Sequence, residues 1–397
     1  MQENLIKAFG CRLNSAETAK LELVADRAGL RGAIIFNTCA VTHEAECQAR
    51  QAIRRAARNN PGRPIYVVGC AIDRDPQGFV AIPGVVRVIK NSDKFDVSSY
   101  GKWKMANGKC NDIIPAAAGF SRGLSKGFLQ IQNGCDYACT YCIVHTLRGP
   151  SRSFPYEAIL RQARELVTGG CSEIILTGVD IAGFEGGLVP LIEKLLKDEP
   201  GIKRLRLSSL DPAKDWQPLI DLTKVQPRVM PHLHLSMQSG SDEILRRMGR
   251  RHRAKDITRL ANDKVTFSVD IICGFPGETA EYFADTVLAL KALRPIRIHA
   301  FPFSARPGTP AADFSNQVPK SVAKTRVQDI NALGKRFLSE FMQAQIGTIA
   351  EVLVERGGIG RTEHDIEVLI PDLPEGAIVK IRLVEVQDGR FVGQPVL

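Results

Sequence analysis

The chain has 397 residues, of which 44% are hydrophobic and 24% are charged. These values are typical of globular proteins, and the length suffices for two or three domains. No apolar run approaches the ~20 residues needed to cross a bilayer, and the first residues lack the basic and apolar stretches of a secretory signal. We therefore expect a cytoplasmic protein with no membrane-spanning segment.

The charge balance indicates a polyanionic partner. The formal net charge is +10 and the isoelectric point is near 9.1. An excess of basic residues favours nucleic acid as the partner, and the alternative is a charge that serves solubility alone. In a reducing compartment, the ten cysteines are expected to be metal ligands or small buried side chains rather than disulfides.

Residues 1–107 are predicted to form a parallel α/β domain. Short apolar strands are expected at 4–9, 33–36 and 64–68. Helices are expected from 15 to about 29, with Ser15 as the N-cap, and from about 44 to 58.

A cysteine follows each of these three strands, namely Cys11, Cys39 and Cys70. The carboxyl ends of parallel strands share one edge of a sheet, which is where ligands bind. We therefore expect the three thiols to converge, with three separately buried side chains as the alternative. The remaining cysteines outside the central cluster have no cysteine close in sequence and are interpreted as structural: Cys47, Cys110, Cys171 and Cys273.

The central feature of the chain is a C-x3-C-x2-C loop formed by Cys135, Cys139 and Cys142. It directly follows a strand predicted at 128–132. Thiolates this close on one loop can hold an iron–sulfur cluster. Zinc, with His145 as a fourth ligand, is the alternative.

Residues 121–345 are predicted to form an incomplete (βα)6 barrel, which gives the whole chain an α/β fold class. Its strands are expected at 128–132, 173–178, 204–209, 232–237, 267–274 and 297–304. Active sites of such barrels lie at the carboxyl ends of the strands. The candidate cofactor-binding residues are Tyr141 of the cysteine loop and the small or polar residues at these ends: Thr177, Gly178, Ser208, Gln238 and Gly274. His232 and His234 are expected to be packed or hydrogen-bonded rather than metal ligands.

Residues 346–397 are predicted to form a small antiparallel β-barrel with strands at 349–354, 366–370, 377–386 and 391–396. Small barrels of this kind often bind RNA, and a stabilising appendage is the alternative.

Eight further segments carry a family pattern: residues 10–14, 37–42, 69–70, 131–135, 148–153, 232–240, 274–279 and 301–310. Together with the three-cysteine loop, they resemble the radical S-adenosylmethionine (SAM) methylthiotransferases along nearly the whole chain. The Cys-Arg-Leu-Asn sequence that begins at Cys11 is most similar to the branch that acts on N6-threonylcarbamoyladenosine in tRNA. The C-terminal barrel resembles the RNA-binding TRAM domain of that family.

The resemblance implies two [4Fe-4S] clusters, with SAM as the second cofactor. Cys135, Cys139 and Cys142 would bind the cluster that cleaves SAM, with one iron left open for it. Cys11, Cys39 and Cys70 would bind a cluster that serves sulfur insertion. No catalytic residue beyond these ligands is expected. The chain departs from the family at His145, where proline is usual, and in a short loop at 184–187.

The implied reaction is transfer of a methylthio group to C2 of N6-threonylcarbamoyladenosine at tRNA position 37. The implied partners are the tRNA anticodon stem-loop and an electron donor such as a flavodoxin or ferredoxin, and the protein would be a monomer. The candidate substrate contacts are Arg12, Arg148 and Arg152, because guanidinium groups bind carboxylates and phosphates, whereas solvated surface charge is the alternative. Other possible functions are methylthiolation of isopentenyladenosine in tRNA or of a ribosomal protein, or a non-catalytic iron–sulfur RNA-binding protein.

Overall fold

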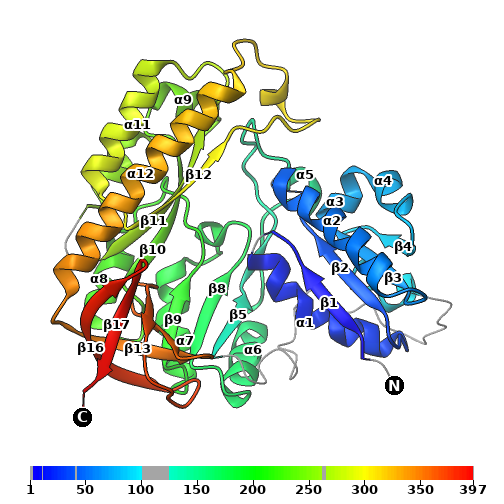
Figure 1. Cartoon of the computed structure of the whole chain (residues 1–397), viewed down its shortest axis with the longest axis horizontal. Coiled ribbons are helices and arrows are strands. Elements are labelled where there is room, and N and C mark those ends of the chain that lie inside the picture. The colour runs from blue at the N-terminus through cyan, green and yellow to red at the C-terminus, as the bar shows by residue number, and fades with distance from the viewer. Residues whose placement is uncertain (1–2, 11, 41–42, 101–124, 262–264, 397) are drawn as a thin grey trace.

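The computed structural model describes residues 3–10, 12–40, 43–100, 125–261 and 265–396 (Figure 1). An amino-terminal α/β unit, a central partial barrel and a small closed β-barrel follow one another along the chain, which confirms the predicted fold class. In the described part of the chain, no helix combines the length and the apolar character that crossing a membrane requires.

The amino-terminal unit is a four-stranded parallel sheet in the order β1-β2-β3-β4. Its strands are β1 (Leu5–Ala8), β2 (Ile34–Thr38), β3 (Ile65–Gly69) and β4 (Val85–Ile89), and its helices are α1 (Arg12–Arg27), α2 (His43–Asn59), α3 (Cys70–Arg74) and α4 (Pro76–Val80). The sequence analysis does not predict β4, an edge strand in which only Ile89 is buried. The predicted cap at Ser15 is wrong because α1 begins three residues earlier.

The central unit consists of two three-stranded parallel sheets that continue into each other. One sheet contains β5 (Lys126–Gln130), β8 (Glu173–Thr177) and β9 (Arg204–Leu207), and the other contains β10 (His232–Gln238), β11 (Thr266–Cys273) and β12 (Arg297–Pro302). Isolated bridges, such as Leu210 with Leu235, join the β9 side to β10. All six strands of the expected incomplete barrel are therefore present, in chain order.

The main helices of the central unit pack apolar faces against one large core. They are α6 (Tyr156–Thr168), α7 (Leu188–Asp198), α8 (Gln217–Val225), α11 (Ala280–Leu293) and α12 (Lys320–Gln345), with shorter helices α5 (Val144–Arg148), α9 (Asp242–Arg247) and α10 (Ala254–Thr258). A short antiparallel pair, β6 (Gln132–Asn133) with β7 (Arg152–Ser153), was not expected from the sequence. This pair closes the base of the cysteine loop.

The C-terminal barrel is closed in the order β13-β14-β15-β17-β16. Its strands are β13 (Ile349–Glu355), β14 (Ile359–Thr362), β15 (Glu367–Leu369), β16 (Ile378–Gln387) and β17 (Arg390–Pro395). The sequence does not predict β14, because the glycines at 357, 358 and 360 indicate a turn. The barrel is not wholly antiparallel, since β15 pairs with β17 in parallel.

The C-terminal barrel lies against the amino-terminal ends of the core strands (Figure 1). Lys126, at the start of β5, is 2.7 Å from Glu355. Arg206 pairs with the buried carboxylate of Glu173 at 2.9 Å and also donates to the backbone carbonyl of Glu363. This end of the core is thus filled by buried ion pairs, which leaves the carboxyl end of the strands for chemistry.

Candidate active site

Hydrogen bonds fix the cysteine loop to the rim of the central unit. The amide of Cys135 donates to the carbonyl of Gly149 at 3.0 Å. The side chain of Gln132 donates to the carbonyl of Gly134 at 2.7 Å, and its Oε1 accepts from the backbone amides of Val179 and Asp180. Gln132 therefore holds the start of the loop against the carboxyl end of β8, and the sequence analysis did not single it out.

The three loop thiols share one electrostatic environment. The Sγ of Cys135 accepts from the Tyr137 amide at 3.4 Å, and the Sγ of Cys142 accepts from the Val144 amide at 3.5 Å. Burial, with the neighbouring carboxylate and thiols, raises the pKa of Cys135 to about 12, and burial raises that of Cys142 to about 11. Such thiols ionise when a metal cation balances their charge, so the donor set fits a [4Fe-4S] cluster.

The zinc alternative has no support from ligand geometry. The ring of His145 lies 3.3 Å from the hydroxyl of the adjacent Thr146. In the described ranges, no group of three histidine, cysteine or acidic side chains is placed to hold a single metal ion.

A buried arginine lies next to the cysteine loop. Nη1 of Arg250 is 3.7 Å from the Sγ of Cys139, and Nη2 is 3.2 Å from a carboxylate oxygen of Asp211 and 2.9 Å from the carbonyl of Ser236. Its side chain is only 7% exposed. A cation here stabilises negative charge on the sulfur of Cys139. Sequence reasoning missed it, and the only signal was a basic run at 246–253.

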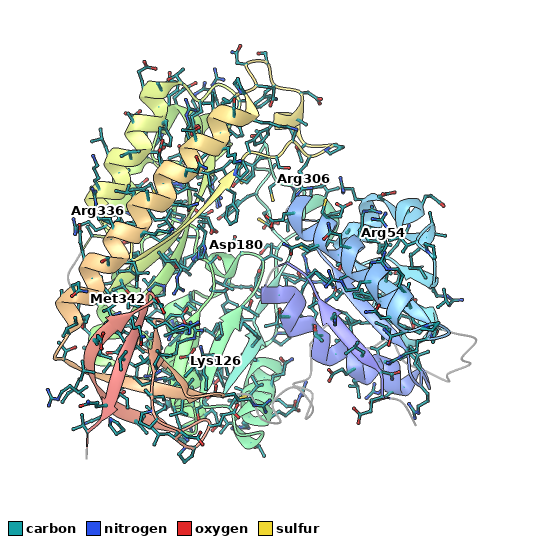
Figure 2. The ribbon with its side chains drawn as sticks, in the orientation of Figure 1. Arg54, Lys126, Asp180, Arg306, Arg336 and Met342 are labelled. Atoms are coloured by element: carbon teal, nitrogen blue, oxygen red, sulfur yellow. The ribbon has the colours of Figure 1, made fainter. Side chains whose placement is uncertain are left out.

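Two carboxylates accompany this cation on the rim. Burial, together with the charge of Asp211, raises the pKa of Asp180 to about 6, although Arg250 acts in the opposite direction. Asp180 lies near the centre of the molecule, between the core and the amino-terminal unit (Figure 2). The rim beside the cysteine loop is thus a desolvated polar region, as a site for a charged cofactor requires.

The predicted cofactor-binding residues have different environments. Thr177 is buried, and a Cβ at Gly178 would lie 2.8 Å from the Gln132 side chain, so this glycine is required by packing. Gly274 has φ of 74°, and its amide donates to Glu278 at 2.6 Å. Among the described residues, the buried hydroxyl of Ser208 has no hydrogen-bond partner. Ser208 therefore has the clearest capacity to bind a ligand.

The amino-terminal cysteines lie where the strand pattern predicts. Cys39 follows β2 and Cys70 follows β3 directly, and both are buried. A Cβ at Gly10, which follows β1, would lie 2.5 Å from the Sγ of Cys39. The end of β1 therefore approaches Cys39 closely. Cys11 itself lies outside the described residues.

A buried polar network links this unit to the cysteine loop. Glu17 of α1 binds Arg148 of α5 at 2.9 Å and Lys94 at 2.5 Å. Asn14 accepts from Arg148 at 3.0 Å, and its amide donates to the carbonyls of Phe9 and Thr38. The network therefore joins the ends of β1 and β2, next to Cys39, to the helix that follows Cys142.

Comparison with known proteins identifies the family. Residues 129–290 match the radical SAM superfamily, and residues 4–90 match a family described as uncharacterized protein family UPF0004. The threonylcarbamoyladenosine tRNA methylthiotransferase MtaB of Rickettsia prowazekii is 39% identical, over 98% of this chain and 97% of its own length. The chain belongs to the radical SAM methylthiotransferase family.

Other members of the methylthiotransferase family match over similar lengths. MtaB of Bacillus subtilis is 30% identical over 97% of this chain and 95% of its own. The tRNA-2-methylthio-N(6)-dimethylallyladenosine synthase of Erythrobacter litoralis is 32% identical over 98% and 96%. A solved radical SAM methyltransferase, TsrM of Kitasatospora setae, has a TM-score of 0.56 at 15% identity, covering 79% of this chain and 74% of its own. This last likeness supports the fold alone.

In this methylthiotransferase, the three predicted substrate arginines differ in their environments. The side chain of Arg148 is 4% exposed and binds Glu17 and Asn14, so its guanidinium links the central unit to the amino-terminal unit. Arg152 lies exposed in β7. Arg12 begins α1, and its side chain is not among those described.

The structure also shows the surroundings of the other residues that the sequence analysis singled out. Tyr141 packs beside an apolar cluster that includes Phe275. His232 and His234 are hydrogen-bonded to Thr266, Ser268 and Asp270, as expected. Cys171 and Cys273 are buried in the main core, as structural cysteines are, whereas Cys47 is half-buried in α2. Cys110 lies outside the described residues.

Proposed function

We propose that this protein transfers a methylthio group to C2 of N6-threonylcarbamoyladenosine at tRNA position 37. The observation that carries the proposal is the 39% identity, over nearly the full length, to a relative named for that substrate. Relatives named for dimethylallyladenosine are 32% identical or less, which favours the first substrate over the isopentenyl one. The relatives compared are named as tRNA enzymes, which does not favour a ribosomal protein as substrate.

The proposed cofactors are two [4Fe-4S] clusters and SAM. Cys135, Cys139 and Cys142 would hold one cluster, and Cys11, Cys39 and Cys70 the other. When bound, the core cluster and SAM supply the one-electron chemistry that activates a C–H bond, and the second cluster serves sulfur insertion.

The chain's own residues provide binding and orientation for that chemistry. Gln132 fixes the cysteine loop to β8, and Arg250 places a positive charge 3.7 Å from the sulfur of Cys139. The buried hydroxyl of Ser208 would bind SAM together with rim residues such as Thr177, Gly178, Gln238 and Gly274, and Tyr141 would pack against it. Burial keeps water away from this rim, as reactive intermediates require.

The three predicted units would divide this work. In the proposal, residues 1–107 carry the sulfur-inserting site, residues 121–345 the SAM site, and residues 346–397 an RNA-binding barrel. Most arginines of the barrel are already paired with acids, for example Arg361 with Glu355 and Arg390 with Glu367. Its contribution to tRNA binding would therefore depend on shape and backbone contacts more than on net charge.

Substrate recognition is proposed to involve Arg12 and Arg152. A guanidinium can form a bidentate pair with the carboxylate of a threonylcarbamoyl group, a contact that an isopentenyl group does not offer. The protein would act as a cytoplasmic monomer on the tRNA anticodon stem-loop and receive electrons from a flavodoxin or ferredoxin.

The experiment that tests the function compares two tRNA substrates. Anaerobically reconstituted protein is incubated with SAM, a reductant and tRNA that bears either N6-threonylcarbamoyladenosine or N6-isopentenyladenosine. Mass spectrometry of the nucleosides should show a methylthio product only from the first. Equal conversion of both, or conversion of the isopentenyl form alone, would reject the substrate while leaving the reaction type intact.

A further inference from the structure

The inner face of the partial barrel carries a row of polar side chains that has no role in the site described above. On β10 and β11, every second residue is buried in the main core between sheet and helices: Leu233, Leu235, Met237, Phe267, Val269, Ile271 and Cys273. Because side chains alternate along a strand, the residues between them face the inside of the barrel. They include two histidines, two hydroxyl groups and one carboxylate: His232, His234, Thr266, Ser268 and Asp270.

Hydrogen bonds join these side chains into one continuous chain that begins in the C-terminal barrel. Its first member lies in the turn between β14 and β15, and the order is His364, Thr266, His232, Ser268, His234 and Asp270. Along this order the successive contacts measure 3.0, 2.8, 3.1, 2.7 and 3.0 Å. The chain therefore connects the C-terminal barrel to a carboxylate in the middle of β11.

The proton positions give this chain a direction. Burial lowers the pKa of His364 to about 4 and that of His232 well below its usual range, so both rings are neutral at pH 7. A carboxylate only accepts hydrogen bonds, so Nε2 of His234 carries the proton that faces Asp270. With the His234 ring neutral, its Nδ1 accepts from the hydroxyl of Ser268, and the same sense continues back to His364. The chain thus holds the Asp270 carboxylate by one of its two oxygens.

The second oxygen of this carboxylate is available to a ligand. The bond to His234 uses Oδ2 of Asp270, and Oδ1 has no hydrogen-bond partner among the described residues. The side chain is 25% exposed. Its neighbour across the strand pair is the exposed His299 of β12, whose ring centroid lies 5.6 Å from that of His234.

The inner face beside Asp270 is not filled by other side chains. Phe301 follows His299 on the same face of β12 and is 42% exposed. In a complete barrel, inner residues at this level pack against one another. Here β12 is the edge strand of its sheet, on the side of α12 that faces the amino-terminal unit (Figure 1). This part of the inner face can therefore receive a ligand.

The chemistry of these side chains selects the kind of ligand. A carboxylate oxygen with free lone pairs requires an N–H or O–H donor. An exposed phenyl ring offers a surface on which an unstacked base of a single-stranded loop can stack. Adenine provides both features, because its exocyclic N6 carries hydrogen, and one hydrogen remains when N6 bears a threonylcarbamoyl or an isopentenyl group.

Two molecules in the proposed reaction contain adenine, namely SAM and the target nucleoside. The target carbon has to be reached both from the SAM site and from the amino-terminal cysteines, and β12 lies on the side of the core that faces the amino-terminal unit (Figure 1). This position favours the target nucleoside. Since C2 and N6 lie on either side of N1 in the ring, a contact at N6 orients C2 without covering it.

We propose that Asp270 accepts a hydrogen bond from the N6–H of the target adenosine, whose base stacks on Phe301 inside the partial barrel. The proposal rests on the proposed function in one respect, namely that the substrate is an adenosine with a substituted N6. Asp270 binds the substrate directly. His234 is a positioning residue, which fixes the orientation of the carboxylate. No covalent bond forms or breaks in this step.

The test compares two RNA hairpins that differ by one hydrogen-bond donor. One anticodon stem-loop carries N6-threonylcarbamoyladenosine, and the other carries its N6-methyl derivative, in which a methyl group replaces the N6 hydrogen. Binding to the reconstituted full-length protein is measured anaerobically by fluorescence anisotropy, with SAM present and no reductant. The parent should bind the first hairpin at least tenfold more tightly, which corresponds to about 1.4 kcal/mol. Asp270→Ala should bind the two hairpins within about twofold of each other.

The ratio of the two affinities separates a contact from a structural role. A variant that is merely less stable weakens both hairpins equally and leaves the ratio at its parental value. The matched control is Asp221→Ala on α8, whose side chain is 56% exposed and which should keep the tenfold ratio. His234→Phe should reduce the ratio to about threefold, and a parental ratio in this variant would remove the positioning role of His234.

A parental ratio in Asp270→Ala would overturn the proposal. A variant that keeps the ratio but loses affinity for SAM would also overturn it, because the carboxylate would then bind the adenine of the cofactor. If the alanine variant fails to retain iron, Asp270→Asn decides. Its amide oxygen can accept from His234, which leaves an NH2 group toward the ligand, so the ratio should fall below about twofold, and a tenfold ratio contradicts the contact.

This outcome is separate from that of the proposed function. The measurement requires no methylthiolated product. If the protein proves to act on isopentenyladenosine, the same comparison with that nucleoside and its N6-methyl derivative tests Asp270 in the same way. Conversely, loss of the Asp270 contact would leave the proposed reaction standing.

Discussion

Replacement of Glu17 by glutamine tests the network that joins the amino-terminal unit to the cysteine loop. Glu17 is 2% exposed and binds both Lys94 and Arg148. Burial alone would raise its pKa, but the charges of Arg148 and Lys94 outweigh burial and lower it from 4.5 to about 2. At 1.36 kcal/mol per unit, this difference corresponds to about 3 kcal/mol of stability at neutral pH.

The glutamine variant also leaves two buried cations without their shared carboxylate. Removal of one partner from a buried ion pair costs about 3–5 kcal/mol, in agreement with the value from the pKa. We therefore expect Glu17→Gln to lower the free energy of unfolding by about 3–5 kcal/mol at pH 7. Urea unfolding followed by circular dichroism measures this change, and hydrogen exchange of β2 and β3 amides locates it in the amino-terminal unit.

The contribution of Glu17 to the free energy of unfolding depends on pH with a defined sign. Because the folded-state pKa of Glu17 is depressed, its contribution is fully present above pH 4.5 and is lost as the pH falls through about 2. The stability gap between wild type and Glu17→Gln should therefore shrink over this window. The control is Asp26→Asn on the same helix, whose side chain is 70% exposed and whose loss should cost at most about 0.5 kcal/mol. A cost below about 1 kcal/mol for Glu17→Gln, or a gap unchanged near pH 2, would refute the reasoning.

Three further predictions concern the cysteine loop and its rim. The Cys135→Ala/Cys139→Ala/Cys142→Ala variant should retain one of two clusters by iron and sulfide analysis, and a full iron count would contradict the ligand assignment. Arg250→Gln should lower the midpoint potential of the core cluster by ~59 mV, which corresponds to an about tenfold lower ratio of reduced to oxidised cluster at a fixed potential. An unchanged midpoint potential in a redox titration would show that this cation has no such effect. Ser208→Ala should weaken SAM binding about fivefold, the equivalent of about 1 kcal/mol for one hydrogen bond, and equilibrium dialysis that finds equal affinity would exclude the contact.

The sequence predicts those parts of the molecule that depend on local patterns. The pattern of apolar stretches that alternate with helical segments predicts all six core strands. The cysteines after β2 and β3 lie at one sheet edge because parallel strands end together. The glycine-rich β14 was missed because its local pattern indicates a turn, whereas β4 was missed although its sequence, Val85–Ile89, is typical of a strand.

The charged partners of the site could not be predicted, because they depend on contacts between distant segments. Arg250 lies 111 residues from Cys139 in sequence, and its basic run is indistinguishable from a solvated surface. Arg148 was interpreted as a substrate contact, whereas the fold directs its guanidinium toward Glu17 and Asn14 of another unit. The burial of an arginine depends on the assembled fold, and no local pattern in a single sequence indicates it.

The position of the C-terminal barrel against the core affects the order of events in turnover. Arg206, Glu173 and Lys126 fill the amino-terminal end of the core, and the barrel covers them, so molecules reach the cysteine loop from the carboxyl side (Figure 1). SAM, its cleavage products and the RNA therefore share one route. We expect RNA binding to follow SAM binding and RNA release to precede cofactor exchange.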